Sequence, residues 1–303
     1  MSVTPHDQHF KKLLITFFNE FLEAFVPEIA SALETRHFEF LDKELVWIRR
    51  RFPKAKFVDL VAKVKLRGTP GFILIHVTHQ AKPDRAIARR MFLYAVWLIE
   101  RYGVPVWPVL VTSYTRPRRA EPSRYEMTVR GKPILIFNYE VVQLNRLNWR
   151  DYLKRPNPAA AALMARMNIA PADRVQVKAS ILRLLLTLRL RPEKAQLILG
   201  FVETYLELTA REELKLRRQL DRLSPDDQAK LMRLLLPGER FGIFKGRQEM
   251  LREDILDILA ARFQDVPYAV REKIQETESE ARLRKLHREA VLVASLEAFA
   301  QSM

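Results

Sequence analysis

Three polar side chains in apolar surroundings, Asp59, Thr78 and Gln80, have the types and spacing for phosphodiester chemistry. Cleavage of a phosphodiester by a divalent cation needs hard oxygen ligands and a group that positions or deprotonates water. An unpaired carboxylate in a Val/Leu/Ala strand is costly to bury, so Asp59 is hard to explain as a core residue. It is therefore a candidate metal ligand. It could equally be a strand-face carboxylate that pairs with Lys63 or Lys65 in solvent.

The other polar residues of this set are less specific. Gln80 can orient a water or bind a phosphate oxygen, but it cannot act as a base. Thr78 is neutral and is also a good strand residue. His76 shares a strand face with Thr78 and Gln80 and could enter a pocket, whereas His79 faces the other way and is expected to be a packing or capping residue.

Two alternating apolar runs position these side chains. Residues 57–65 and 72–80 flank the turn Gly68-Thr69-Pro70-Gly71, a pattern that predicts a β-hairpin. Period-2 geometry then places Asp59, Lys63 and Lys65 on one face of the first strand.

The surrounding pattern predicts a mixed α/β core, 1–155, followed by helices. Helical periodicity covers 6–33 with a break at Pro27, and 84–102 up to Gly103. Strands are predicted at 104–112, 125–129 and 134–137, although the prolines of the first make an interior position less certain. The expected layer arrangement is a sheet flanked by helices.

Beyond Pro156 the pattern is almost wholly helical. Helices are predicted at 158–169, 174–190, 192–209, 211–222, 225–235, 244–264 and 268–299. We therefore expect a helical region, 156–238, and a helical C-terminal tail domain, 239–303. These helices could also mediate a homodimer.

The charge is strongly basic and unevenly distributed. The chain has 303 residues and a net charge of +16, and residues 1–238 hold 41 Lys/Arg against 24 Asp/Glu. Such a body indicates a polyanionic partner, of which DNA is preferred over an acidic lipid surface. The candidate DNA-binding residues are Arg49, Arg50, Arg51, Lys54, Lys56, Lys63, Arg85, Arg89 and Arg90, and Arg116, Arg118 and Arg119 add a basic loop.

The absence of cysteine excludes disulfides and thiolate metal sites. No run of 18 apolar residues and no basic-then-apolar leader is found, so we expect a cytoplasmic protein without a membrane partner.

A set of motifs in a fixed order resembles a known family. The motifs are His6-Asp7-x-x-Phe10-Lys11, Phe38-Glu39-Phe40-Leu41-Asp42-Lys43-Glu44, Val58-Asp59-Leu60-Val61, Ile75-His76-Val77-Thr78-His79-Gln80, Ala88-Arg89-Arg90-Met91-Phe92-x-Tyr94 and Tyr102-Gly103-x-Pro105-Val106-x-Pro108. Together they resemble the recombination-promoting nuclease, YhgA-like transposase family, over about 6–163. Residues 254–299 are similar to the helical tail often attached to that family.

The resemblance implies a PD-(D/E)XK restriction-endonuclease-like fold and Mg²⁺-dependent DNA endonuclease chemistry linked to recombination. By position, Asp59 matches the first-strand metal ligand and Gln80 matches the glutamine that replaces the motif's lysine. The family pattern Glu-His-Gln reads Thr78-His79-Gln80 here, so the catalytic glutamate is missing. Lys12 stands where relatives often have an acidic residue.

Three functions remain open from the sequence. The first is a DNA-interacting family member with weakened or lost cleavage. The second is an active Mg²⁺ nuclease in which Glu39, Asp42 or Glu44 supplies the missing ligand. The third is a non-catalytic assembly or adaptor protein that works through its helices. A continuous basic groove over Asp59 would favour DNA, and scattered basic residues would favour the adaptor.

Overall fold

A β-hairpin forms the centre of the structure, as the alternating pattern predicted. Strand β2 (Val58–Val64) pairs antiparallel with β3 (Ile73–Gln80), and the register places Asp59 opposite Thr78. All eight residues of β3 are buried, because the strand has neighbours on both sides and helices over both faces. The hairpin prediction is therefore confirmed.

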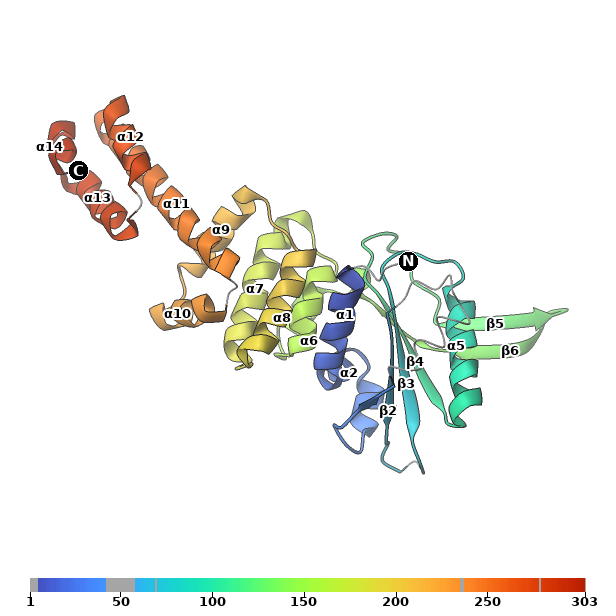
Figure 1. Ribbon diagram of the computed structural model, residues 1–303. Helices are drawn as coiled ribbons and strands as arrows, with labels where there is room; N and C mark the ends of the chain where they lie inside the picture. The colour runs from blue at the N-terminus through green and yellow to red at the C-terminus, as the bar shows by residue number, and fades with distance from the viewer. Residues whose placement is uncertain (1–4, 42–57, 69, 235–236, 278, 303) are drawn as a thin grey trace. The chain divides into compact units, whose positions relative to one another are not determined.

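The hairpin belongs to a mixed five-stranded sheet with the order β1-β2-β3-β4-β7 (Figure 1). The added strands are β1 (Glu39–Phe40), β4 (Val106–Thr112) and β7 (Glu140–Gln143). Strands β3, β4 and β7 run parallel, so their carboxyl ends lie at one edge. The prolines do not keep β4 from an interior position, because β7 pairs with it only from Val109 onward and Pro108 has one neighbouring strand.

Helix α5 (Ile87–Tyr102) covers one face of the sheet, and its Leu98 packs on Val61 and Leu74. Gly103 ends this helix in a left-handed conformation, φ +63°, as predicted. The helix begins later than predicted, because the Asp84 carboxylate accepts a hydrogen bond from the Ala86 backbone N–H in the turn before it.

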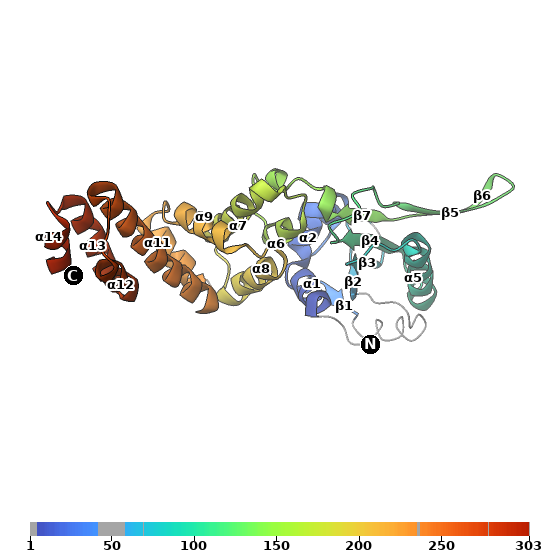
Figure 2. The ribbon, with the colours of Figure 1, turned by 90° about the horizontal axis from the view of Figure 1, so that it is seen from above.

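The opposite face is covered by the N-terminal helices, so the sheet lies between two helical layers (Figure 2). Helix α1 (Pro5–Thr16) is followed by α2 (Phe18–Phe25) and α3 (Pro27–Ala32), with an unpredicted break at Phe17 as well as the one at Pro27. Phe10 of α1 is fully buried and stacks on the His79 ring, with ring centroids 3.7 Å apart.

A second, two-stranded sheet follows β4 in the chain. Strands β5 (Arg124–Val129) and β6 (Lys132–Asn138) form a hairpin whose base packs on α5, where Phe92 stacks on Tyr125. Both views show this hairpin projecting beyond α5 (Figures 1 and 2).

The structure describes residues 5–41, 58–68, 70–234, 237–277 and 279–302, and the chain divides into two compact units, Met1–Glu207 and Leu208–Met303. Helices α6 (Pro158–Leu163), α7 (Arg174–Thr187) and α8 (Pro192–Tyr205) lie in the first unit with the sheet. The predicted division at 155/156 and 238/239 differs from these units and stays a prediction.

The second unit is helical. It comprises α9 (Ala210–Leu220), α10 (Pro225–Leu234), α11 (Pro237–Phe263), α12 (Tyr268–Glu276), α13 (Glu280–Leu292) and α14 (Leu296–Ser302). Its core includes Ile255, Leu259, Leu286 and Phe299.

The predicted fold class, a mixed α/β sheet flanked by helices and followed by a helical region, is confirmed. The arrangement agrees with the α/β nuclease-like fold that the resemblance implied. Within the described ranges, no helix combines the length and the apolar character needed to cross a membrane.

Candidate functional site

Thr78 occupies the position that the register places directly across from Asp59. Its side chain is fully buried, and its Oγ1 lies 3.2 Å from Nε2 of His76 in a hydrogen bond. His76 in turn packs edge-on against Tyr94 of α5. The backbone of Asp59 is described but its side chain is not, so the structure gives the position of the candidate ligand and not its contacts.

Gln80, at the carboxyl end of β3, has both polar atoms of its amide engaged. Its Nε2 donates to the Lys82 carbonyl, and its Oε1 accepts from Nη2 of Arg90 at 3.0 Å. Arg90 also forms an ion pair with Asp84. The sequence predicted Arg90 as a DNA contact, but the structure places it mainly inside the protein, where it orients Gln80.

His79 lies on the opposite face of β3 and is a packing residue, as the sequence suggested. Its Nε2 lies 2.8 Å from the Ser113 hydroxyl in a hydrogen bond, while Arg166 donates to the Ser113 carbonyl at 2.7 Å. Burial, and then the positive charge of Arg166, lower the pKa of His79 from its ordinary 6.5 to about 3. The imidazole is therefore neutral at physiological pH.

Because His79 is buried and neutral, we expect the free energy of unfolding to depend on pH in the acid range. Its pKa is lower in the folded than in the unfolded chain, so protonation between pH 6.5 and 3 favours unfolding. The free energy of unfolding should be highest above about pH 6.5 and fall by up to about 1.4 kcal/mol per pH unit below it. A His79→Phe variant keeps an aromatic ring against Phe10 and should show a smaller slope in urea titrations from pH 7 to 4. Equal slopes for both proteins would contradict this reading.

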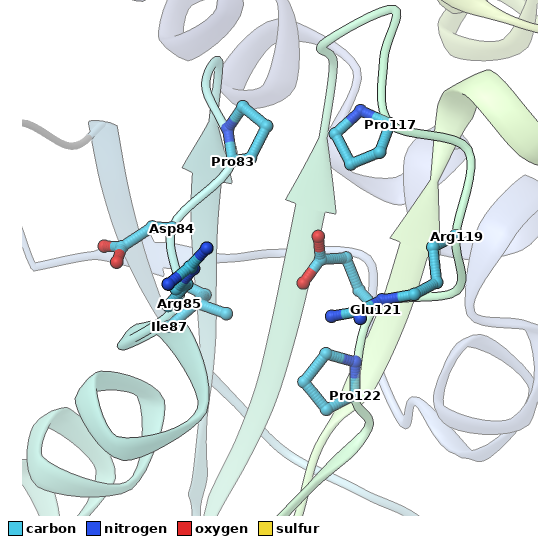
Figure 3. Close-up of a pocket in the computed structure, with 8 residues that line it drawn as sticks. All are labelled: Pro83, Asp84, Arg85, Ile87, Pro117, Arg119, Glu121 and Pro122. Carbon is cyan, nitrogen blue, oxygen red and sulfur yellow. The ribbon is translucent and has the colours of Figure 1, made fainter.

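A cleft of about 450 Å³ opens where β3 and β4 end. Pro83, Asp84, Arg85 and Ile87, which follow β3, line one side, and the loop after β4 supplies Pro117, Arg119, Glu121 and Pro122 (Figure 3). Arg119 extends from its loop toward the middle of the cleft (Figure 3). The carboxyl ends of parallel strands are the usual location of ligand clefts in open α/β sheets.

Buried amides hold the basic loop of this cleft in place. Gln143 of β7 accepts from the Glu121 N–H and donates to the Arg119 carbonyl, both at 2.9 Å. Asn145 donates to the Pro117 carbonyl at 2.9 Å. These hydrogen bonds hold the backbone of the loop in place, whereas the side chains of Arg116, Arg118 and Arg119 are exposed.

The acidic residues of the cleft are also engaged. Glu121 accepts a hydrogen bond from the Tyr114 hydroxyl. Burial, and then this carboxylate, raise the pKa of Tyr114, so the phenol stays protonated. Asp84 accepts hydrogen bonds on both of its oxygens, from the Ala86 N–H and from Arg90. Within the part of the chain that the structure describes, no three His, Asp or Glu side chains cluster as a metal site.

The structure describes only some of the basic residues that were predicted to bind DNA. Arg49, Arg50, Arg51, Lys54 and Lys56 lie outside the described residues, as do Asp42 and Glu44. Lys63 pairs with Glu39 across β1 and β2 at 3.4 Å. Arg85, just before α5, and Arg89, in its first turn, are exposed, and Arg85 lines the cleft.

The sequence analysis did not select Asp84 and Glu121, which line the cleft, or Tyr114 and Gln143, which hydrogen-bond to its loop. The arginine loop 116–119 was the one available signal, because it predicted a basic surface past β4. The pairing of loop and β7 residues more than 20 positions apart has no local sequence pattern.

Comparison with known proteins finds relatives of the N-terminal part of the chain. Residues 4–105 match the family model described as "Putative transposase, YhgA-like". A stretch of 110 residues is 32% identical to the recombination-promoting nuclease RpnC of Escherichia coli (strain K12). The resemblance to the YhgA-like family that the motifs predicted is therefore confirmed over residues 4–105.

The match is partial. It covers 33% of this chain, and the chain spans about a third, 34%, of the length of RpnC. No solved structure matches the chain.

Proposed function

We propose that this chain is a cytoplasmic DNA-binding protein that keeps a nuclease-like sheet but whose Mg²⁺-dependent cleavage is weakened or lost. The observation that carries the proposal is the buried Thr78 opposite Asp59 in the β2–β3 register. A hydroxyl that is hydrogen-bonded to His76 is a poor ligand for Mg²⁺, which prefers carboxylate oxygens. The described donors therefore do not fit a Mg²⁺ site, and we derive no catalytic step through the metal.

DNA binding is supported by where the charge lies. The first unit carries 34 Lys/Arg and 19 Asp/Glu, a net of +15, whereas the second carries 18 and 17, a net of +1. Arg85 and Arg119 are exposed on opposite sides of the cleft and make no ion pair with described residues. A charged unit with exposed guanidinium groups around a cleft suits phosphate-backbone contacts.

An active nuclease is the alternative, and the register bears on one of its candidate ligands. Glu39 lies opposite Lys63, four residues along β2 from Asp59. At about 3.3 Å per residue this is about 13 Å, too far for both to bind one ion. Asp42 and Glu44 lie outside the described residues and keep this alternative testable. The name of the relative RpnC, a recombination-promoting nuclease, also favours it.

Anisotropy titrations of a labelled DNA duplex at several salt concentrations test the proposal. Affinity should fall at least about 100-fold between roughly 50 and 200 mM salt, because binding releases counterions from several phosphates. The double variant Arg85→Gln/Arg119→Gln should bind more weakly and with a smaller salt slope. A control with the same charge change, Lys215→Gln/Arg218→Gln on α9, should bind like the unchanged protein. Absence of duplex binding at low salt would overturn the proposal.

A further inference from the structure

The β5–β6 hairpin is a ribbon with one anchored end and one open end. At its base, Tyr125 and Phe137 pack on Phe92 of α5, with ring centroids 5.4 and 5.5 Å away. Its strands have six and seven residues, about 20 Å at 3.3 Å per residue. The outer part extends away from the five-stranded sheet (Figure 2).

The outer part of the hairpin exposes large apolar side chains beside basic ones. The exposed apolar residues are Met127, Val129, Ile134 and Ile136. The register pairs Met127 with Leu135 and Val129 with Lys132, so Met127, Val129 and Lys132 share one face, on which Met127 is 49% and Val129 is 59% exposed. A face of this kind on a projecting element is typical of a binding surface.

The turn at the tip retains an arginine in an unfavourable conformation. Arg130 and Gly131 connect the strands with φ of +49° and +80°, the pattern of a two-residue type I′ turn. Asn or Gly normally occupies the first position, since other residues cost about 1–2 kcal/mol there. An arginine at this position places a guanidinium group at the tip of the β5–β6 hairpin.

We propose that the β5–β6 hairpin enters the major groove of double-stranded DNA. Arg130 and Lys132 would contact phosphates, and Met127 and Val129 would lie against the groove floor, where thymine exposes a methyl group. A two-stranded ribbon has the width that the major groove admits, about 12 Å. The inference rests on the proposed function and adds to it a groove and an element that reads it.

Charge favours DNA over a second copy of this chain as the occupant. The hairpin, 124–138, contains Arg124, Arg130 and Lys132 against Glu126, a net of +2. Pairing two such hairpins would bring like charges together, whereas a groove lined by phosphates neutralises them. The apolar face is compatible with either partner, so the charge decides between them.

The hairpin offers a variant that removes charge without disturbing its turn. Arg130→Asn places the preferred residue at the left-handed position, and Lys132→Gln keeps a side chain of similar length. The double variant should bind a duplex about 10-fold more weakly, with a salt slope smaller by about 1.8. Lys215→Gln/Arg218→Gln again serves as the charge-matched control and should retain the affinity of the unchanged protein.

A duplex carrying glucosylated 5-hydroxymethylcytosine, whose sugars fill the major groove, tests the groove directly. The unchanged protein should bind it less tightly than the plain duplex, and the hairpin variant should discriminate less. Equal binding of both duplexes by the unchanged protein would overturn the major-groove assignment. If the hairpin variant binds plain DNA as tightly as the unchanged protein, only this inference fails. If the unchanged protein binds no DNA, the proposed function fails with it.

The variant Met127→Ser/Val129→Ser distinguishes DNA from a second copy of this chain as the occupant of the apolar face. Loss of DNA affinity with an unchanged sedimentation coefficient supports the groove. Loss of a dimer with unchanged DNA affinity would instead assign the apolar face to a second copy and overturn the proposal.

Discussion

The variant Thr78→Glu is expected to nick supercoiled plasmid in the presence of Mg²⁺, whereas the protein with Thr78 cleaves weakly or not at all. The change places a carboxylate across from Asp59, at the register position where the resemblance to the family implies a glutamate. Thr78 is fully buried, so a carboxylate there is costly without a partner. A bound cation would supply that partner.

The stability of the Thr78→Glu variant with and without Mg²⁺ is a readout that does not depend on cleavage. In EDTA the Thr78→Glu variant should unfold at a lower temperature than the unchanged protein. Saturating Mg²⁺ should restore stability, by about 2.7 kcal/mol at a concentration 100 times the dissociation constant. Thr78→Gln is the matched control, because its amide has similar size and should gain neither Mg²⁺ stabilisation nor cleavage.

Two outcomes would contradict the disarmed-nuclease interpretation. Rapid, EDTA-sensitive cleavage by the protein as it stands would mean that another acid completes the site. A Thr78→Glu variant that folds, yet neither gains stability from Mg²⁺ nor cleaves, would mean that this sheet edge is not a metal site.

The largest loss of stability is expected from Phe10→Ala. Phe10 stacks on His79 of β3 and packs edge-on against Phe201 and Tyr205 of α8, with ring centroids 4.9 and 5.7 Å away. It therefore joins three elements of the first unit. Truncation of a fully buried Phe costs about 3–5 kcal/mol, since transfer and cavity terms add.

Tryptophan fluorescence during urea unfolding measures this loss selectively. All four tryptophans, Trp47, Trp97, Trp107 and Trp149, lie in the first unit, so the second contributes no such signal. Phe72→Ala is the control, because this ring is 46% exposed and its removal should cost about 1 kcal/mol or less. A Phe10→Ala midpoint equal to that of Phe72→Ala would contradict the central role of Phe10.

The sequence predicts the centre of the fold because local signals are strong there. Alternation with a Gly/Pro turn gave the β2–β3 hairpin, and Gly103 gave the end of α5. It missed β1 and β7, which have two and four residues and little periodicity of their own. Strand β7 is also continuous in pattern with β6, although the two belong to different sheets.

The site was predictable only as far as strand faces. The spacing placed Thr78 and Gln80 on one face of β3 and His79 on the other, and their contacts agree with this. It could not give the partners of Arg90, or the buried Gln143 that fixes the arginine loop, because those contacts depend on tertiary packing. The sequence pattern around a charged residue is the same whether its side chain faces solvent or orients a neighbouring side chain.

The parallel pairing of β3 with β4 bears on how this protein can be divided. The family-model match ends at residue 105, one position before β4 begins, yet β4 pairs with β3 from Leu74 to Gln80. A fragment cut there would expose a long, apolar edge strand, the kind of surface that drives aggregation. The stretch that the family model matches is thus shorter than the stretch needed to complete this sheet.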